Sequence, residues 1–371
     1  MPLAGAATKA RCLFLFTPSS EPCGVETFTR TLAGALAASD PGAGYQLLPV
    51  SGHWREVSAI LRRIAAADQV VFSLPLVAWK RMLLIPLLLL LFSFATRRRI
   101  STFLHEWTAM HRLRRLVLLP FVWLSSTILV LSPYIRSQIA NDRWLAGAAR
   151  KCRLVPHPPT VRRPPSLTTT DRVRKVEHAA QDCDLVIGYF GAIYEGKAPT
   201  ALLEICNDLR GRGIRALIVF IGSFMQSLDG YEGRFRARVK ELALNDQVIV
   251  TGYVESGNEL FALFERIGAF LFLYPEGLTA RRSSVIACLQ SSRPVVVSAP
   301  PSPDEFRHHQ GFTTLIEGGA LSFVPRSAPV AEIADHLLAA AGRQAGTVPA
   351  IDGDAWWTAA TAAAGAALAR S

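Results

Sequence analysis

The chain has 371 residues, of which half are hydrophobic, and a formal net charge of +11 at pH 7. This length favours two domains, each large enough to bury a core of its own. The six cysteines show no C-x-x-C or zinc spacing, which excludes a zinc module and favours a reduced, cytoplasmic setting. Residues 1–11 lack an apolar segment before a cleavage site, so no secretory signal is expected.

The positive charge is confined to the first half of the chain. Residues 1–155 hold 19 Lys and Arg against 7 Asp and Glu, whereas residues 156–371 hold 21 against 22. We therefore expect an anionic partner for the first half, such as a membrane surface or a phosphorylated lipid. Arginine-rich codon usage is the alternative explanation. Nucleic acid is not expected, because no module with interleaved aromatic and basic residues is present.

The first half alternates apolar runs with segments of helical period, the pattern of a Rossmann-like domain. The stretch 116–131 is divided by Pro120 and Ser125-Ser126 into a helix end and a strand. The remaining strands are expected at 11–16, 47–50, 69–73, 100–104 and 153–155, and helices at 25–38, 56–67 and before residue 140.

An apolar run over 82–95 is flanked by Lys80-Arg81 and by Arg97–Arg99. The run is shorter than the roughly 20 residues that a spanning helix needs, and it contains Pro86. Two interpretations remain, a core helix packed on a sheet and an interfacial helix on anionic lipid. Both hold if they describe opposite faces of the same helix.

Several residues of the first half are candidates for binding. Gly24, in the loop after the first strand, permits close backbone approach to a ligand, or serves only as a turn glycine. His105 stands at the carboxyl end of a strand, where it would face a cleft between the domains, unless its role is structural. Glu106 and His111 would hold its tautomer or touch an acceptor. Arg112 would contact an acceptor phosphate, or belong to a solvated face.

The composition changes to Pro, Thr and Arg at 156–183, which marks a boundary. We expect a first domain over 1–160, a linker over 161–183 and a second domain over 184–354. An Ala-rich helix over 355–371, anchored by burial of Trp356 and Trp357, would return to the first domain. In the second domain, strands are expected at 185–190, 216–221, 248–250, 270–273 and 295–297, and helices at 199–211, 231–243, 259–265, 281–290 and 330–341.

The stretch 270–298 reads as strand, loop, helix and strand, and such a loop lies at the carboxyl edge of a parallel sheet, where ligands bind. Thr279 is expected to cap the helix, whose first N–H groups and dipole suit a phosphate. The Glu276 carboxylate can accept sugar hydroxyls, and Arg281 or Arg282 can grip phosphate oxygens. Lys197, in a Gly-containing loop before a helix, would meet a diphosphate, or is a solvated lysine. The other donor-side candidates are Gly222, Val254, Gly277, Leu278 and Ser284.

These motifs resemble those of glycosyltransferase family 4, a GT-B group of the exopolysaccharide or surface-glycan type. The family carries E-x7-E, of which Glu276 matches the first Glu, the one that contacts the donor sugar. Ser284 stands where the second Glu would hold the ribose, and the loss of that acceptor costs roughly 1.5–3 kcal/mol. The LHE motif ending at Glu106 and the G-x(5)-K segment ending at Lys197 also match. Ala192 stands where many members have Arg.

The resemblance implies two Rossmann-like α/β domains facing across a cleft, with the terminal helix crossing back to the first. It implies transfer of a sugar, with retention, from a nucleotide-sugar to a lipid-linked glycan acceptor. His105, Lys197 and Glu276 would be the catalytic residues. No metal or cofactor would be needed, and the donor phosphate would take the acceptor's proton. We expect a cytoplasmic protein at the inner face of the plasma membrane. The alternative is a degenerate GT-B protein that binds a nucleotide or a partner without transfer.

Overall fold

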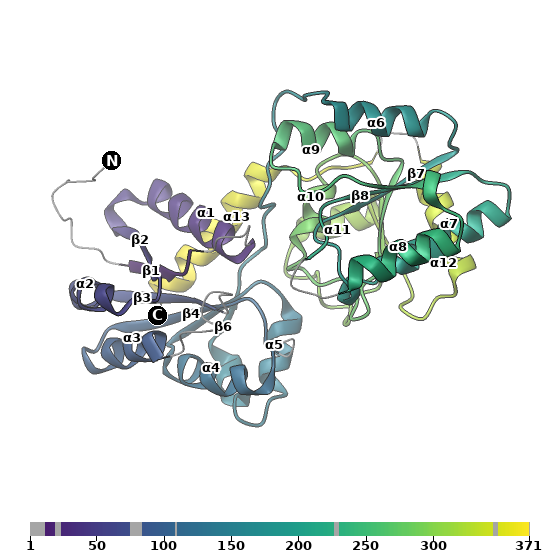
Figure 1. Cartoon of the computed structure of the whole chain (residues 1–371). Coiled ribbons are helices and arrows are strands. Elements are labelled where there is room, and N and C mark those ends of the chain that lie inside the picture. Colours follow the sequence, from purple (N-terminus) through teal and green to yellow (C-terminus); the bar gives the residue numbers. More distant parts are fainter. Residues whose placement is uncertain are drawn as a thin grey trace. The chain divides into compact units, whose positions relative to one another are not determined.

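The computed structural model describes residues 12–18, 24–74, 84–107, 110–225, 230–343 and 348–370 (Figure 1). The chain divides into two compact units, one made of Met1–Thr160 and Ala355–Ser371 and the other of Val161–Asp354. Each unit contains a six-stranded sheet in which the neighbouring strands run parallel. The predicted architecture of two α/β domains is confirmed.

The sheet of the first unit has the strand order β2-β1-β3-β4-β5-β6. Its central strands are buried on both faces, which is why they appear in the sequence as continuous apolar runs rather than alternating ones. The strands are β1 (Cys12–Phe16), β2 (Tyr45–Pro49), β3 (Gln69–Leu74), β4 (Arg99–Leu104), β5 (Thr127–Val130) and β6 (Cys152–Leu154).

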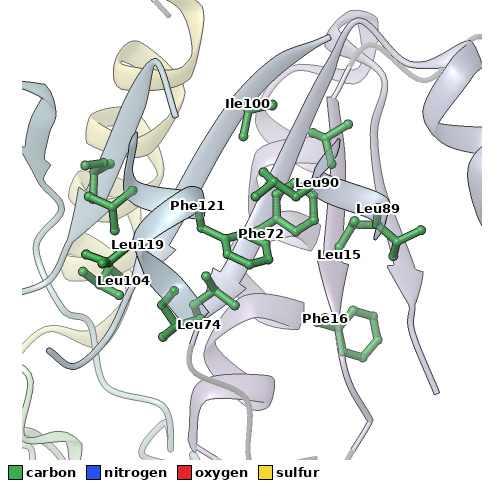
Figure 2. Packing of buried hydrophobic residues seen from close by; sticks show 14 of the residues in the cluster. Leu15, Phe16, Phe72, Leu74, Leu89, Leu90, Ile100, Leu104, Leu119 and Phe121 are labelled. Carbon is green, nitrogen blue, oxygen red and sulfur yellow. The ribbon is translucent and has the colours of Figure 1, made fainter. Parts of the chain in front are cut away.

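Helices cover both faces of this sheet, and two hydrophobic clusters separate accordingly (Figure 1). In the larger cluster, Phe72 of β3 packs edge-on against Phe121, with ring centroids 5.2 Å apart, and Leu89 and Leu90 lie nearby (Figure 2). One face carries α1 (Gly24–Ser39) and α13 (Gly353–Ala369); the other carries α2 (Trp54–Ala66), α3 (Leu84–Ala95), α4 (Arg112–Leu124) and α5 (Pro133–Ala140).

The terminal helix α13 completes the smaller cluster. Trp357 is buried and stacks on Phe28 of α1 with a centroid distance of 5.9 Å, and its indole N–H donates to the Pro159 carbonyl at 3.0 Å. Ala360 and Ala364 are fully buried beside it. Trp356 is also buried, so the predicted anchoring of this helix by its tryptophans is confirmed.

The sheet of the second unit has the strand order β12-β11-β10-β7-β8-β9. Its strands are β7 (Leu185–Phe190), β8 (Ala216–Ile221), β9 (Val248–Val250), β10 (Ala269–Phe272), β11 (Val295–Ser298) and β12 (Leu321–Val324). Its helices are α6 (Asp171–Ala180), α7 (Pro199–Gly211), α8 (Tyr231–Glu241), α9 (Gly257–Phe264), α10 (Ser283–Cys288), α11 (Gln310–Glu317) and α12 (Val330–Ala341).

Three features of this unit differ from expectation. The expected linker 161–183 belongs to the second unit and contains α6, because Thr170 caps a helix that buries Val173 and Val176. Helix α10 spans six residues instead of the ten expected over 281–290, since the chain turns at Leu289. Helix α11 and strand β12 were not predicted, and their short apolar runs are only partly buried.

The chain segments that enter and leave the second unit are attached to the end of α10. The buried Gln290 side chain donates to the Val161 carbonyl at 2.7 Å and accepts from the Arg163 N–H at 3.2 Å. The Ile351 N–H donates to the Leu289 carbonyl at 3.0 Å. The Arg162 guanidinium pairs with the carboxylate of residue 354 at 2.9 Å, so the two segments are also joined to each other.

Some predicted features lie outside the described residues, namely Arg11, Cys23 and the Lys80, Arg81 and Met82 positions. The five described cysteines are free, and burial raises the pKa of the Cys12 thiol to about 12. Within the described residues, no helix has the length and apolar content that crossing a membrane requires.

Replacement of Trp357 tests the packing of α13. We expect Trp357→Ala to lower the free energy of unfolding by about 3–5 kcal/mol, because it leaves a cavity and an unpaired carbonyl. Urea unfolding followed by circular dichroism measures this loss. Trp54→Ala is the matched control, since that side chain is 60% exposed and its loss should change stability by less than about 0.5 kcal/mol. Equal effects would contradict the packing described.

Candidate functional site

The donor-side candidates of the second unit gather at the carboxyl edge of its sheet. Strand β7 pairs with β10, with Gly188 opposite Phe270, so the loops that follow these two strands leave the sheet side by side. The first loop carries Lys197 and the second carries Glu276 and Arg282. The edge where parallel strands end is the usual place for a ligand in an open α/β sheet.

Lys197 lies at the end of a single 3₁₀ turn over Glu195–Lys197, just before α7. Its ammonium lies 5.4 Å from the centre of the Tyr194 ring, and a Cβ added to Gly191 would come within 3.2 Å of it. The ammonium therefore lies against the backbone at the end of β7. Burial, together with the positive charge of Arg282, lowers the pKa of Lys197 to about 8. No carboxylate among the described residues forms an ion pair with it.

Arg282 is held between two partners in the loop after β10. Its guanidinium forms an ion pair with Glu276 and lies 4.5 Å above the centre of the Tyr274 ring. The Tyr274 hydroxyl is 3.1 Å from the Ser284 Oγ. Burial raises the pKa of Tyr274 to about 12, so the phenol keeps its proton at neutral pH. The Nε of Arg282 is buried and finds no hydrogen-bond acceptor within the described residues.

Lys197 and Ser284 thus meet beside one glycine. Gly191 has a φ of +122°, and a Cβ placed there would also come within 3.5 Å of the Ser284 Cβ. Gly222, after β8, lies against Gly191 so closely that any side chain would clash with its carbonyl. The result is a backbone corner beside the Lys197 ammonium, and Arg282 is near enough to Lys197 for its charge to lower the pKa of the ammonium. Glu276, whose side chain is about one-third exposed, is the carboxylate that pairs with Arg282.

Two backbone anchors fix the loop that carries Glu276. Gly277 has a φ of +84° and lies against the Ala299 carbonyl, where a side chain would clash. The Leu278 N–H donates to the Ser298 carbonyl at 3.0 Å. The fully buried Glu305 accepts from the Ala280 N–H at 2.8 Å.

Glu305 and Tyr274 are site residues that the sequence analysis missed. Both lie in loops that follow apolar strands at the same sheet edge. For Glu305, the available signal was its charge in a loop that is rich in Pro and Ser. The other predicted donor-side residues lie at this edge too. Val254 is buried in the loop after β9, and the Gly222 N–H donates to the Thr251 hydroxyl at 3.3 Å.

Thr279 does not cap α10, which corrects one expectation. The helix begins at Ser283 with Arg282 at the N-cap position, and no side chain caps it. Thr279 instead belongs to the preceding turn, where its carbonyl accepts from the Arg282 N–H at 3.1 Å. Its buried hydroxyl has no hydrogen-bond partner within the described residues. Arg281 also precedes the helix, so the positive charge of this loop comes mainly from side chains rather than from a six-residue helix.

In the first unit, His105 is buried just after β4. Its Nε2 lies 3.3 Å from the Ser73 Oγ, and Ser73 in turn lies 2.7 Å from the Thr29 Oγ1. The imidazole packs against the rings of Phe103 and Phe28, with centroid distances of 4.6 and 5.8 Å. The ring is therefore held in one orientation by packing and by a hydroxyl.

The other predicted residues of the first unit lie after β4 or at the start of α4 and α1. Glu106 is half-buried, beside Trp107, whose indole N–H donates to Asp142 at 3.1 Å. His111 is exposed and caps α4, because its Nδ1 accepts from the Leu113 N–H at 3.3 Å. Arg112 is the exposed first residue of α4. Gly24 opens α1, and a Cβ added there would meet no other atom within 4 Å.

Comparisons with known proteins bear on the fold. No protein-family model matches the chain, and no curated protein matches its sequence. HepE from Anabaena, solved with UDP, superposes with a TM-score of 0.62 at 13% identity over 97% of this chain and 95% of HepE. HepE solved with UDP-glucose gives 0.60 at 14% identity, over 97% and 94%. A glycosyltransferase from Rickettsia africae gives 0.57 at 10% identity, over 98% and 94%.

The chain has the GT-B fold. This likeness extends over both units and agrees with their two parallel sheets. Within the described residues, no group of three or more His, Cys, Asp or Glu side chains gathers to hold a metal ion. Independence from metal stays a prediction.

The lowered pKa of Lys197 predicts a stability change. The unfolded chain keeps this proton up to pH 10.5, whereas the folded chain loses it near pH 8, so stability rises with pH between these values. We expect Lys197→Met to raise the free energy of unfolding at pH 7 by about 1–2 kcal/mol, with the gain vanishing near pH 10. Urea unfolding at several pH values measures it. The exposed Lys240→Met is the control, and a gain at pH 7 shared by both variants would contradict the prediction.

Proposed function

We propose that this protein is a glycosyltransferase that moves a sugar from a nucleotide-sugar donor to a lipid-linked glycan acceptor. The observation that supports it best is the pair of half-buried cations, Lys197 and Arg282, in the loops after β7 and β10, of which Arg282 is paired with Glu276 and Lys197 has no ion pair within the described residues. A diphosphate supplies the negative charge that this corner lacks. HepE, which shares the fold, is solved with UDP-glucose.

The two cations have distinct roles in this proposal. Lys197 acts as a point charge on the diphosphate, and binding of the anion raises the pKa of its ammonium towards the ordinary range. Arg282 offers its unpartnered Nε and its remaining N–H groups to phosphate oxygens. Together they stabilise the charge that develops on the leaving diphosphate as the glycosidic bond breaks.

Glu276 changes partner when the donor binds. Its carboxylate is paired with Arg282 in the structure. A phosphate that draws the guanidinium away leaves the Glu276 oxygens to accept hydrogen bonds from the sugar. Donor binding and sugar recognition are then coupled through one ion pair.

We assign no protein residue as the base that takes the proton of the acceptor. We propose that the donor phosphate itself takes the acceptor's proton, with retention of anomeric configuration and without metal or cofactor. Ser284, held by Tyr274, takes the place of a carboxylate towards the ribose. His105 would lie by the sugar ring, and Glu106, His111 and Arg112 would serve the acceptor.

A second candidate is a GT-B protein that binds a nucleotide or a partner without transfer. It is favoured by the Glu276–Arg282 ion pair, which occupies both potential substrate contacts in the structure. Ser284 and Ala192 stand where the related motifs carry Glu and Arg. The two candidates differ in whether sugar is transferred, and only the first requires nucleotide binding.

Titration calorimetry with UDP, GDP and their sugars tests the donor site. We expect Lys197→Met to weaken nucleotide diphosphate binding by at least about tenfold, because a charge-assisted contact is lost. Glu276→Ala should reduce the preference for the sugar-nucleotide over the bare nucleotide and leave the latter nearly unchanged. Lys240→Met is the matched control, since its lysine is exposed on α8. No nucleotide binding by the unaltered protein contradicts the transferase and favours the partner-binding form of the second candidate. Nucleotide binding without transfer to any lipid-linked acceptor also supports the second.

The first unit suggests where the acceptor is found. Helix α3 turns an apolar row outward, with Leu84, Leu88, Leu91 and Phe94 between 37% and 70% exposed. Helix α4 covers the same face of the sheet and adds three exposed apolar side chains, those of Leu113, Leu116 and Trp123. The inner side of α3 lies in the core, which agrees with the first interpretation of the 82–95 run. The exposed apolar row supports the second, an interfacial helix, as part of this proposal.

The part of the chain that carries these apolar side chains is rich in basic residues. Between residues 84 and 153 the chain carries 11 Lys and Arg against two Asp and Glu, including Arg97–Arg99 after α3 and Arg114 and Arg115 in α4. Apolar and basic side chains together suit an anionic lipid surface. We propose that the protein works in the cytoplasm at the inner face of the plasma membrane, in the synthesis of an exopolysaccharide or surface glycan.

Sedimentation with anionic and neutral liposomes tests the membrane contact. We expect binding to anionic vesicles that falls with salt, and that weakens by at least about tenfold in the triple variant Arg97→Ser, Arg98→Ser, Arg99→Ser. Leu91→Ser with Phe94→Ser should weaken it at all salt concentrations. The control is Leu167→Ser with Met225→Ser, which removes two exposed apolar side chains from the second unit. Binding that is absent at every salt concentration contradicts this part of the proposal and leaves the donor site untouched.

A further inference from the structure

A buried tyrosine connects two of the donor-side residues of the second unit. Tyr274 follows β10, and only 1% of its surface is exposed. Its ring stacks on Phe272 with a centroid distance of 5.8 Å, and the Arg282 guanidinium lies 4.5 Å from the ring centre. These contacts fix the ring, and its hydroxyl oxygen is 3.1 Å from the Ser284 Oγ. One side chain therefore contacts Arg282 through its ring and Ser284 through its hydroxyl.

Counting protons gives the hydrogen bond between the two hydroxyls a direction. Burial raises the pKa of Tyr274 to about 12, so the phenol has a proton to donate at neutral pH. Among the residues that the structure describes, Ser284 is the only hydrogen-bond partner of the phenol oxygen. If Ser284 donated to that oxygen, the phenol proton would be buried without an acceptor, which is unfavourable. The phenol therefore donates and the Ser284 oxygen accepts.

The Ser284 hydroxyl accepts this hydrogen bond and keeps its own proton, because a hydroxyl can accept and donate at the same time. Ser284 is half-buried, and in the described part of the chain its hydroxyl has no hydrogen-bond partner besides Tyr274. Its proton is therefore available to a ligand. A Cβ added to Gly191 would lie 3.9 Å from the Ser284 Oγ and 3.2 Å from the Lys197 Nζ, so the hydroxyl and the ammonium lie close together.

We infer that Tyr274 is a positioning residue that presents Ser284 to the nucleotide as a hydrogen-bond donor. A carboxylate at position 284 could only accept hydrogen bonds, so the serine reverses the direction of the hydrogen bond at this place. The matching ligand group is an oxygen that accepts a hydrogen bond, which a nucleoside diphosphate offers in its phosphates and in its ribose. This part of the inference rests on the proposed function, whereas the direction of the hydrogen bond between the two hydroxyls does not.

Raman spectroscopy of the full chain without nucleotide tests the direction of this hydrogen bond. The intensity ratio of the tyrosine ring doublet differs between a phenol that donates and one that accepts. The chain has seven tyrosines, so Tyr274 is observed as the difference between the unaltered protein and Tyr274→Phe. We expect a donating phenol, whose signature is lost in Ser284→Ala and kept in Ser284→Thr, which retains the hydroxyl. An accepting phenol in the unaltered protein, or an unchanged signature in Ser284→Ala, overturns the inference.

A double-mutant cycle in nucleotide affinity tests the positioning role. We expect Tyr274→Phe and Ser284→Ala each to weaken binding of the preferred nucleotide, UDP or GDP, by about threefold to tenfold in titration calorimetry. The double variant should bind no more weakly than Ser284→Ala, since the phenol acts through that hydroxyl. Tyr274→Phe keeps the ring against Arg282, and Tyr45→Phe in the first unit is the matched control. Unchanged affinity in Tyr274→Phe, losses that add in the double variant, or an equal loss in Tyr45→Phe overturns the positioning role.

A nucleotide analogue that lacks both ribose hydroxyls identifies the ligand oxygen. With this analogue, the loss of affinity caused by Ser284→Ala persists if the hydroxyl serves a phosphate oxygen and disappears if it serves the ribose. Both results agree with a donating Ser284, whereas unchanged nucleotide affinity in Ser284→Ala contradicts it. A protein that shows the donating phenol but binds no nucleotide contradicts the proposed function and leaves the direction of the hydrogen bond standing.

Discussion

The edge of the second sheet carries more positive than negative charge, and the arrangement of the site follows from that imbalance. Arg282 lies close enough to Lys197 to lower the pKa of its ammonium, while Glu276 is paired with Arg282. An ammonium at such a place costs free energy until an anion arrives. The surrounding glycines bring backbone rather than side chains to the same corner, which leaves room for that anion.

The two units place polar groups in opposite ways. In the second unit, charged side chains meet at the open edge of the sheet. In the first, a line of two hydroxyls and one imidazole, those of Thr29, Ser73 and His105, is enclosed in the core, where they lie within hydrogen-bonding distance of one another. The exposed apolar side chains of α3 and α4 lie on the other face of this sheet from α1 and α13. A single sheet thus separates a polar core line from an apolar outer surface.

Much of the fold follows from the sequence, for a physical reason. Strands buried on both faces read as unbroken apolar runs, and the fully buried β8 was predicted with its observed bounds. The bounds of β7 and β9 were also predicted as observed. Strand β12 was missed because it has only four residues and Ser322 interrupts its apolar run. Helix α10 was overestimated because its apolar pattern continues to Leu289, whereas Leu289 and Gln290 lie beyond the helix and bind other segments.

The candidate site was predictable only in part. The positions of Lys197 and Glu276 after strands place them at one edge, since all strands of a parallel sheet end there. The contacts that give these residues their properties join distant positions, as Glu305 does with Ala280 and Ser73 does with Thr29, 44 residues apart. No local pattern encodes such pairs, so Tyr274, Glu305 and the hydroxyl line emerged only from the folded chain.

The segments that enter and leave the second unit are both attached to Leu289 and Gln290, and this has a consequence for protein engineering. The second unit behaves as an insert whose two ends, near Arg162 and Asp354, are already neighbours. Domains with adjoining ends tolerate excision and transplantation well. Residues 161–354 can therefore be grafted into a loop of an unrelated carrier protein, or circularised through a short peptide, without stretching their fold.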